Sequence, residues 1–219
     1  MKFLAISRFL LIIILPFLIF LLILNFTGFS DSFYREKFSE YNVLKNVPQA
    51  DSLHEKVMEF INGKSSELPK EFNYREGQHL LDVRNIIRIA AILIYSLVIL
   101  FLLLLIASSF ILNANARIIN FIGKILVFGG LLTIILAALL FFIINSNFSP
   151  AFESFHQLFF QKGTYLFDPA KEIIVNLYPE KLFMDLGIRM SKLVVITSAI
   201  TILIGAFLLL KSKKIKKSR

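Results

Sequence analysis

Residues 89–112 read IAAILIYSLVILFLLLLIASSFIL, a run of apolar and small side chains without Asp, Glu, Lys or Arg. A helix needs about 20 such residues to cross the hydrocarbon core of a bilayer. Three more runs share this character, although the third contains Lys124, and we expect membrane spans at about 9–26, 89–112, 119–144 and 193–210. Ten-residue stretches of alternating polarity, typical of membrane β-strands, are absent from the sequence, so the spans are predicted to be helices.

The composition of the whole chain points the same way. Of its 219 residues, 57% are hydrophobic and 18% are charged, whereas an average soluble domain has about 25% charged residues. These values exclude an ordinary soluble globular protein and a disordered chain, which would be poor in apolar residues. The sequence has no Cys, which excludes a disulfide framework, a thiol nucleophile and a Cys-ligated metal site.

The charged residues separate into two groups along the chain. All 15 acidic residues lie in segments 27–88 and 145–192, whereas the remaining connections and the tail 211–219 carry ten Lys and Arg and no acid. By the positive-inside rule, we expect both termini in the cytoplasm and both long segments outside. The first run is expected to be an uncleaved anchor rather than a signal peptide, because its core is long and no A-x-A-like site follows. The basic tail is predicted to contact anionic lipid, and no pattern indicates nucleic-acid binding.

The sequence therefore predicts an all-α integral membrane bundle of four transmembrane helices with a small extracytoplasmic cap of short helices, as a single membrane domain over 1–219. In the first external segment, apolar periodicity predicts one amphipathic helix over 48–62 that ends at Gly63. A second helical pattern begins at Arg75 and is expected to run directly into the second span.

The second external segment is rich in aromatic residues. Phe148, Phe152, Phe155 and Phe159 recur at helical spacing, and such a face either lies in the headgroup layer or packs on the neighbouring spans. Three X-Pro pairs in this segment are typical of helix starts: Ser149-Pro150, Asp168-Pro169 and Tyr178-Pro179.

Ionisable groups are nearly absent from the spans, which argues against an ion-coupled transporter, a pump or a cation channel. The three histidines all lie in the external segments, and histidine is the residue best suited to proton transfer near neutral pH. His54 borders the apolar face of helix 48–62 and is interpreted as structural. His79 precedes Asp82 by three residues, and Glu153 precedes His156 by three, so each pair shares a helix face.

Other catalytic signatures are missing from the sequence. A Gly-x-Ser-x-Gly nucleophile elbow and a Gly-rich phosphate loop are both absent. Each His–carboxylate pair would also suit a metal ion, but we expect no metal, since a carboxylate-rich surface often produces such pairs by chance.

Longer sequence elements surround His79 and His156. Tyr74-Arg75-Glu76 followed by His79-Leu80-Leu81-Asp82-Val83-Arg84 resembles the "RE…H-x-x-DV-(K/R)" element of the lipoprotein intramolecular transacylases, a four-span membrane family of low-GC Gram-positive bacteria. Phe155-His156-Gln157-Leu158-Phe159-Phe160, then Phe167-Asp168-Pro169 and Tyr178-Pro179-Glu180 with Phe183, resembles the family's "FH-x-x-FF … W-x-FDP … (L/F)PE-x-(F)F" element. Their order and spacing match over roughly residues 5–210. Tyr165 stands where the family has Trp, and Glu172 stands where it has Asp.

The resemblance implies an enzymatic activity. Members of this family move the sn-2 acyl chain of an S-diacylglyceryl-cysteine lipoprotein to its N-terminal α-amine, giving the lyso form, N-acyl-S-monoacylglyceryl lipoprotein. It implies His79 and His156 as acid–base residues at the boundary of the outer membrane leaflet, with Asp82 orienting His79 and Arg84 or a backbone N–H stabilising the oxyanion. The further supporting residues are Asp168, Glu153 and Tyr165.

The same resemblance implies a multi-pass protein of the cell membrane whose partners are membrane lipids and diacylglyceryl lipoproteins, with no cofactor and no nucleic acid. Two other functions remain open from the residues alone. One is a non-catalytic scaffold that binds lipids or lipoproteins, which the abundant Phe would suit. The other is an external metal-dependent lipid hydrolase.

Overall fold

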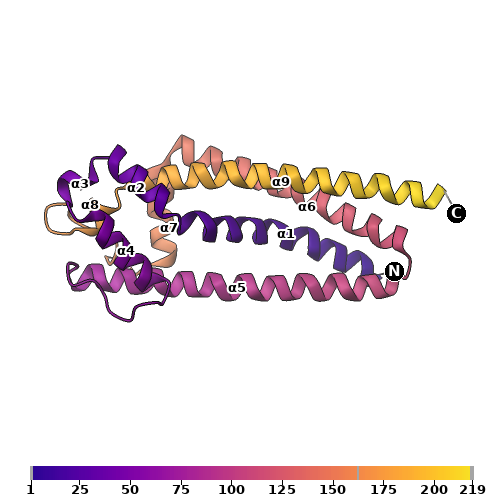
Figure 1. Ribbon diagram of the computed structural model, residues 1–219, viewed down its shortest axis with the longest axis horizontal. Helices are drawn as coiled ribbons and strands as arrows, with labels where there is room; N and C mark the ends of the chain where they lie inside the picture. Colours follow the sequence, from indigo (N-terminus) through magenta and orange to yellow (C-terminus); the bar gives the residue numbers. More distant parts are fainter. Residues whose placement is uncertain (1, 162, 218–219) are drawn as a thin grey trace. The chain divides into compact units, whose positions relative to one another are not determined.

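The computed structural model describes residues 2–161 and 163–217, and the regular secondary structure of these residues is entirely helical (Figure 1). This confirms the prediction of an all-α chain. The long helices are α1 (Lys2–Gly28), α5 (Tyr74–Leu112), α6 (Asn115–Ser146) and α9 (Glu180–Lys217). The short helices are α2 (Asp31–Glu40), α3 (Val43–Asn46), α4 (Ala50–Ile61), α7 (Phe148–Phe159) and α8 (Ile174–Leu177).

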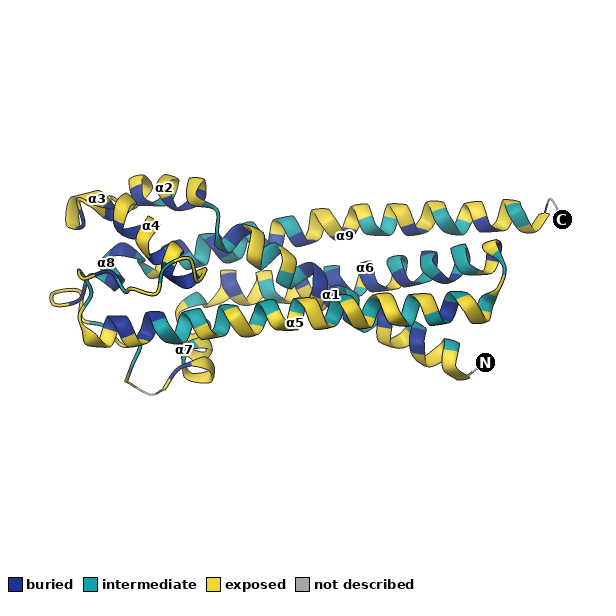
Figure 2. Cartoon of the chain, turned by 60° about the horizontal axis from the view of Figure 1, so that its bottom comes forward, coloured by how far each residue is buried: buried dark blue, intermediate teal, exposed yellow. Residues whose placement is uncertain are grey.

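Each long helix contains one of the four predicted spans and is long and apolar enough to cross a membrane. Their apolar side chains are largely uncovered, as the exposed residues along α5 in Figure 2 show. In α5, only 6% of the most apolar window is buried by the rest of the protein. Exposing so much apolar surface to water would be strongly unfavourable, so these helices require a lipid environment.

One compact unit of the chain comprises Met1–Asn25, Leu93–Phe142 and Arg189–Arg219. Its helices pack through a core around Leu11, Phe121 and Ile125. Helices α6 and α9 approach closely at glycines, because a Cβ atom added to Gly205 would lie 2.9 Å from the carbonyl oxygen of Gly123. Small residues that permit such backbone contact are typical of helix packing in membranes.

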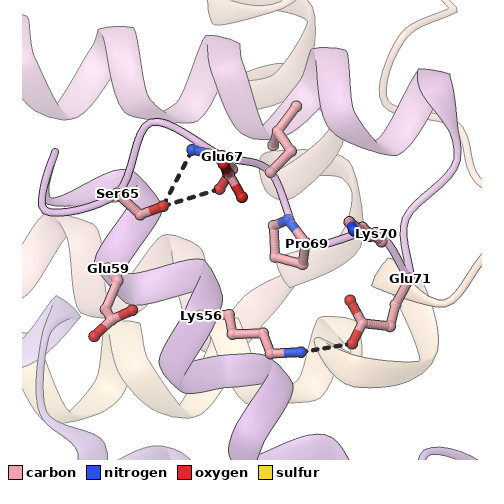
Figure 3. A pocket seen from close by; sticks show the side chains of 8 residues that line it. Lys56, Glu59, Ser65, Glu67, Pro69, Lys70 and Glu71 are labelled. Carbon is pink, nitrogen blue, oxygen red and sulfur yellow. Dashed lines mark hydrogen bonds and ion pairs between the residues drawn. The ribbon is translucent and has the colours of Figure 1, made fainter.

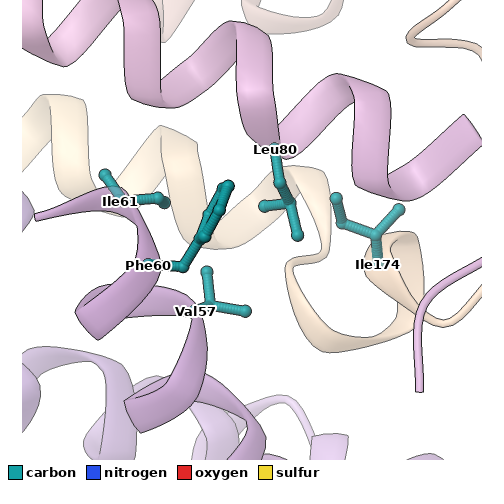
Figure 4. Close-up of a cluster of buried hydrophobic side chains, with 5 residues drawn as sticks. All are labelled: Val57, Phe60, Ile61, Leu80 and Ile174. Atoms are coloured by element: carbon teal, nitrogen blue, oxygen red, sulfur yellow. The ribbon is translucent and has the colours of Figure 1, made fainter. Parts of the chain in front are cut away.

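A second compact unit comprises Phe26–Ile92 and Ile143–Ile188. Its core joins α4, α5 and α8, and burial of these apolar side chains stabilises the short helices. Figure 4 shows the members of this core, Val57, Phe60, Ile61, Leu80 and Ile174. This unit contains all three histidines and all 15 acidic residues of the sequence, so the candidate chemistry lies within it.

Helix α4 ends as the sequence predicts. Gly63 has a φ of +74°, a left-handed conformation that glycine adopts without the steric cost of a Cβ atom. The N–H of Lys64 donates to the carbonyl of Glu59 at 2.9 Å, and the N–H of Gly63 donates to Phe60 at 3.0 Å. These two bonds form a Schellman motif, which satisfies the last carbonyls of the helix. Helix α5 also runs from Tyr74 to Leu112 without a break, as predicted.

Three local predictions need correction. Segment 27–88 contains α2 and α3 in addition to α4, so it has more than one short helix. Helix α7 begins at Phe148 with Asn147 at its N-cap, so it starts before the Ser149-Pro150 pair that the sequence suggests as its start. The hydroxyl of Ser149 donates to the carboxylate of Glu180.

The pair Asp168-Pro169 begins a turn rather than a helix. The N–H groups of Lys171 and Glu172 both donate to the carbonyl of Asp168 at 2.9 Å, and helix α8 begins later, at Ile174. In contrast, α9 begins at Glu180, directly after Tyr178-Pro179, which confirms the third predicted helix start.

Candidate active site

The fold brings His79 and His156 together. His79 lies near the start of α5 and His156 lies in α7, and their ring centroids are 6.0 Å apart with the ring planes 15° from parallel. His79 is 8% exposed. The two histidines that the sequence elements single out therefore lie side by side, although they come from different segments between the membrane helices.

Aromatic rings surround this pair. The Phe160 ring lies 4.6 Å from that of His79 and 5.2 Å from that of His156, centroid to centroid. The Phe167 ring meets His79 edge-on at 5.3 Å. Phe152 and Tyr165 contact His156 at 4.3 and 5.2 Å. The rings around the buried His79 keep water away from its imidazole, and this low local polarity strengthens electrostatic interactions there. His156 is only partly buried.

A backbone hydrogen bond orients His156. Its Nδ1 lies 2.8 Å from the carbonyl oxygen of Phe152, one turn earlier in α7. A carbonyl oxygen only accepts hydrogen bonds, so Nδ1 carries the proton and donates it. In the neutral ring, Nε2 is then left with a free lone pair. His156 is therefore held in the tautomer that offers Nε2 as a base.

His79 is held in its neutral form. It precedes the apolar run 89–112, and burial lowers the pKa of its imidazole to about 4, with a smaller contribution from neighbouring His156. Its Nδ1 is buried and has no hydrogen-bond partner among the described residues. An unsatisfied buried nitrogen costs about 1–3 kcal/mol, and such atoms often mark functional sites.

For two of the predicted supporting residues, the described part of the chain shows no hydrogen bond or ion pair with this pair. Asp82 is half-buried, and it donates or accepts no hydrogen bond with His79, whose Nδ1 is unpaired among the residues described. The guanidinium of Arg84 lies over the Phe60 ring at 4.8 Å. The roles suggested for Asp82 and Arg84 thus stay predictions.

The remaining supporting residues behave differently from one another. Tyr165 contacts His156 through its ring. Glu153 is exposed and accepts a hydrogen bond from Gln157 at 3.1 Å. Asp168 accepts one from the N–H of Ala170 at 3.0 Å within its own turn. Among residues 2–161 and 163–217, no cluster of three His, Asp or Glu side chains has the geometry to hold a metal ion.

Two buried acids near the site were not predicted to have a role. Glu76 is 1% exposed and Glu172 is 5% exposed. The N–H of Glu76 donates to the side chain of Asn73 at 3.0 Å, and its carboxylate accepts the Asn73 N–H at 2.7 Å. This reciprocal pair is a capping box at the start of α5. The Asn-x-x-Glu spacing could have predicted this capping box from the sequence. No periodicity in the irregular segment around Glu172 could have predicted that its side chain is buried.

His54 occupies a separate cluster in the same unit. Its Nδ1 lies 2.8 Å from the hydroxyl of Tyr178, and the rings of Tyr34 and Phe38 pack against it at 4.2 and 5.5 Å. Burial lowers the pKa of His54 to about 4. These contacts agree with the structural role that the sequence suggested for this residue.

A shallow pocket of about 260 Å³ lies elsewhere on this unit (Figure 3). Its polar lining mixes both charges, and Lys56 pairs with Glu71 at 2.7 Å across it. The remaining lining residues are Glu59, Ser65, Glu67, Leu68, Pro69 and Lys70. None of the three histidines lines this pocket.

The family of the chain follows from its sequence. The sequence-family model of the lipoprotein intramolecular transacylase Lit matches residues 9–183 of this chain. The chain belongs to the Lit family. No match was found among the curated proteins compared. The resemblance seen in the two histidine elements is thereby confirmed.

Solved Lit structures share the fold. The membrane-integral Lit from Bacillus cereus superposes with a TM-score of 0.79 at 20% identity, covering 96% of this chain and 97% of that chain. A B. cereus Lit variant with a His-to-Arg mutation gives a TM-score of 0.78 at 20% identity, covering 98% and 94%. Together with the four apolar helices, this likeness identifies a multi-pass membrane protein of the Lit family.

Proposed function

We propose that this chain transfers the sn-2 acyl group of an S-diacylglyceryl-cysteine lipoprotein to the α-amine of the same cysteine. The product is the N-acyl-S-monoacylglyceryl lipoprotein. One observation carries the proposal: His79 and His156 lie with ring centroids 6.0 Å apart among aromatic side chains, in a chain of the lipoprotein intramolecular transacylase family.

The reaction exchanges one bond for another. The α-amine nitrogen bonds to the ester carbonyl carbon, the bond from that carbon to the glyceryl oxygen breaks, and one proton moves from nitrogen to oxygen. An α-amine has a pKa of about 7.7–8.0, so it must lose its extra proton before it attacks. Imidazoles are suited to both proton transfers. Because both reacting groups belong to one substrate, holding them together supplies part of the acceleration.

The two imidazoles suit different parts of this proton transfer. The Phe152 carbonyl holds Nδ1 of His156 protonated, which leaves Nε2 to take the amine proton. Burial keeps His79 neutral near pH 7, so a proton arriving at His156 meets no adjacent positive charge. Like charges at such separation disfavour each other. The proton taken from nitrogen then passes to the departing glyceryl oxygen, either from His156 or through His79.

The distribution of charge supports an extracytoplasmic position for this site. Positive residues dominate the segments that the positive-inside rule assigns to the cytoplasm, and the histidines lie in the acid-bearing segments. We therefore place this site at the outer leaflet boundary of the cell membrane, where diacylglyceryl lipoproteins would reach it. Asp82 and Arg84 remain candidates for orienting and oxyanion-stabilising roles once substrate is bound.

Expression in a host whose lipoproteins carry only the diacylglyceryl form tests the activity. Mass spectrometry of N-terminal lipoprotein peptides is expected to detect the N-acyl-S-monoacylglyceryl form when the chain is present. The matched control expresses the His79→Ala, His156→Ala double variant at the same membrane level. Unchanged diacylglyceryl peptide with well-inserted wild-type protein would contradict the proposal and favour a lipid- or lipoprotein-binding scaffold.

A chelator separates this reaction from a metal-dependent lipid hydrolase. We expect EDTA to leave the yield of N-acyl peptide unchanged, because the acyl shift needs only proton transfer and positioning. A loss of activity on chelation that added Zn²⁺ restores would instead favour metal-assisted hydrolysis.

A further inference from the structure

The segment 163–174 connects the region after α7 to α8 without forming a helix of its own before Ile174. Two consecutive residues at the start of α5, Arg75 and Glu76, hold both ends of this segment. Both residues lie one turn before His79.

Arg75 holds the first part of the segment. Its Nη2 donates to the carbonyl oxygen of Leu166 at 2.5 Å and to that of Gly163 at 3.4 Å. Its Nη1 lies 3.4 Å from the buried carboxylate of Glu172, and its guanidinium lies over the Phe167 ring at 5.5 Å. Glu172 in turn accepts the N–H of Asp168 at 2.6 Å. One guanidinium thus ties four positions of the segment to α5.

Glu76 fixes the far end of the same segment. Its buried carboxylate accepts the N–H of Ile174 at 2.8 Å, while its other oxygen accepts the N–H of Asn73. A charged acceptor buried with two backbone donors makes strong hydrogen bonds. The start of α8 is therefore fastened to the start of α5 by a residue three positions from His79.

The segment between these attachments carries two rings of the histidine site. Tyr165 contacts His156 at 5.2 Å, and Phe167 meets His79 edge-on at 5.3 Å. Tyr165 and Phe167 flank Leu166, whose carbonyl is the one Arg75 holds most closely. Displacement of this carbonyl would therefore move both rings relative to the imidazoles.

We propose that Arg75, acting with Glu172 and Glu76, is a positioning residue that clamps segment 163–174 and so sets the placement of Tyr165 and Phe167 against the two histidines. The inference deepens the proposed transacylase function and rests on it. As a positioning residue, Arg75 does not touch the reacting atoms. A planar guanidinium with several donors reaches two carbonyls and a carboxylate at once, whereas a lysine ammonium would not reproduce that fork.

Purified full-length protein in detergent, acting on a synthetic diacylglyceryl lipopeptide, tests the clamp. Arg75→Ala is expected to lower kcat by about 10- to 100-fold with KM within about threefold of wild type, because small misplacement of positioning groups is costly. The kcat of Arg75→Lys is expected to lie between those of the wild type and Arg75→Ala. Arg35→Ala is the matched control, since Arg35 is exposed on α2, and it should keep the wild-type kcat.

Chemical rescue separates positioning from general damage. The Arg75 side chain is 50% exposed, so added guanidinium ion can reach the vacated place, and we expect millimolar guanidinium to restore part of the kcat of Arg75→Ala. It should not restore His79→Ala. Glu172→Gln gives a second, milder variant that leaves the arginine in place, and it should lower kcat in the same direction.

Hydrogen–deuterium exchange tests the clamp independently of activity. The amides of Asp168 and Glu172 are expected to exchange faster in Arg75→Ala than in Arg35→Ala. A wild-type kcat in Arg75→Ala, a kcat loss that guanidinium does not rescue, or unchanged amide protection would each overturn the inference. If wild-type protein performs no transacylation, the proposed function fails, and exchange alone then decides whether Arg75 clamps the segment.

Discussion

Two buried histidine sites within one compact unit differ in how their rings are satisfied. His54 and His79 are 2% and 8% exposed, and burial lowers the pKa of each to about 4. His54 shares a hydrogen bond with Tyr178 through Nδ1 and packs among aromatic rings, while its Nε2 is buried without a hydrogen-bond partner among the described residues. His79 also packs among aromatic rings, but its Nδ1 is unpaired among the described residues and its nearest polar ring is a second imidazole.

Burial and a shifted pKa are common to both histidines, so they do not by themselves indicate a catalytic role. Structural groups show the same shifts as functional ones. Each ring leaves one buried nitrogen without a hydrogen-bond partner among the described residues. What separates the sites is the neighbour: a tyrosine hydroxyl bonds Nδ1 of His54, whereas a second imidazole, with a tautomer that leaves Nε2 available, faces His79. The stability of the protein should therefore depend on the first site and its activity on the second.

The largest effect is expected in activity. His79→Ala or His156→Ala should lower the transacylation rate by at least about 100-fold, since proton-transfer groups contribute roughly 10²–10⁴-fold. His54→Ala, compared per mole of folded protein, should stay within about threefold of wild type. Rates of N-acyl lipopeptide formation, followed by mass spectrometry, check both. An equal loss in all three variants would erase the distinction between the sites.

The next effect is expected in stability. His54→Ala should reduce the free energy of unfolding by about 2–4 kcal/mol, because it opens a cavity and leaves the Tyr178 hydroxyl unpaired. His79→Leu should leave stability unchanged or raise it by up to about 1 kcal/mol, because it removes a buried nitrogen without a partner. Unfolding in denaturant, monitored in detergent, measures both. A greater loss in His79→Leu than in His54→Ala would contradict the comparison.

Stability should also fall with acid. The folded pKa values of His54 and His79 lie near 4, below the ordinary value of 6.5, so the unfolded chain binds more protons between these limits. The free energy of unfolding should therefore decrease as pH falls from 6.5 to 4, by up to roughly 3 kcal/mol for each histidine. Melting temperatures across this range check the trend. In His54→Phe, the decrease should be visibly smaller, and an unchanged slope would contradict this origin.

The smallest expected effect concerns the partner of His54. Tyr178→Phe keeps the ring but removes the hydroxyl that lies 2.8 Å from Nδ1, so unfolding should become easier by about 1 kcal/mol. The transacylation rate should stay at the wild-type level. Denaturant midpoints and lipopeptide assays on the same preparation test this. A rate loss without a stability loss would assign Tyr178 to the reaction instead.

The sequence predicts the membrane helices well, for physical reasons. Long apolar runs such as 89–112 form helices in lipid whatever their neighbours, because no other partner for the backbone exists there. The short helices depend on tertiary contacts instead. Ser149 donates its hydroxyl to Glu180 rather than capping α7, which local sequence cannot show.

The rest of the site depends on three-dimensional detail. Spacing places His79 and Asp82 on one helix face, but it does not fix where a ring nitrogen points, and His79 directs its contacts to aromatic rings. Tyr165 and Phe167 reach the imidazoles from an irregular segment that has no periodicity to read. Their placement depends on Arg75, which is distant in sequence, and on its ion pair with Glu172.

A double-mutant cycle on His79 and His156 tests the central claim, that the two imidazoles act as one unit. Rates for His79→Ala, His156→Ala and the double variant are measured on the same diacylglyceryl lipopeptide. Residues that act as a unit are strongly non-additive, so the double variant should be within about threefold of the slower single variant. Losses that multiply, or a single variant that keeps the wild-type rate, would contradict the account.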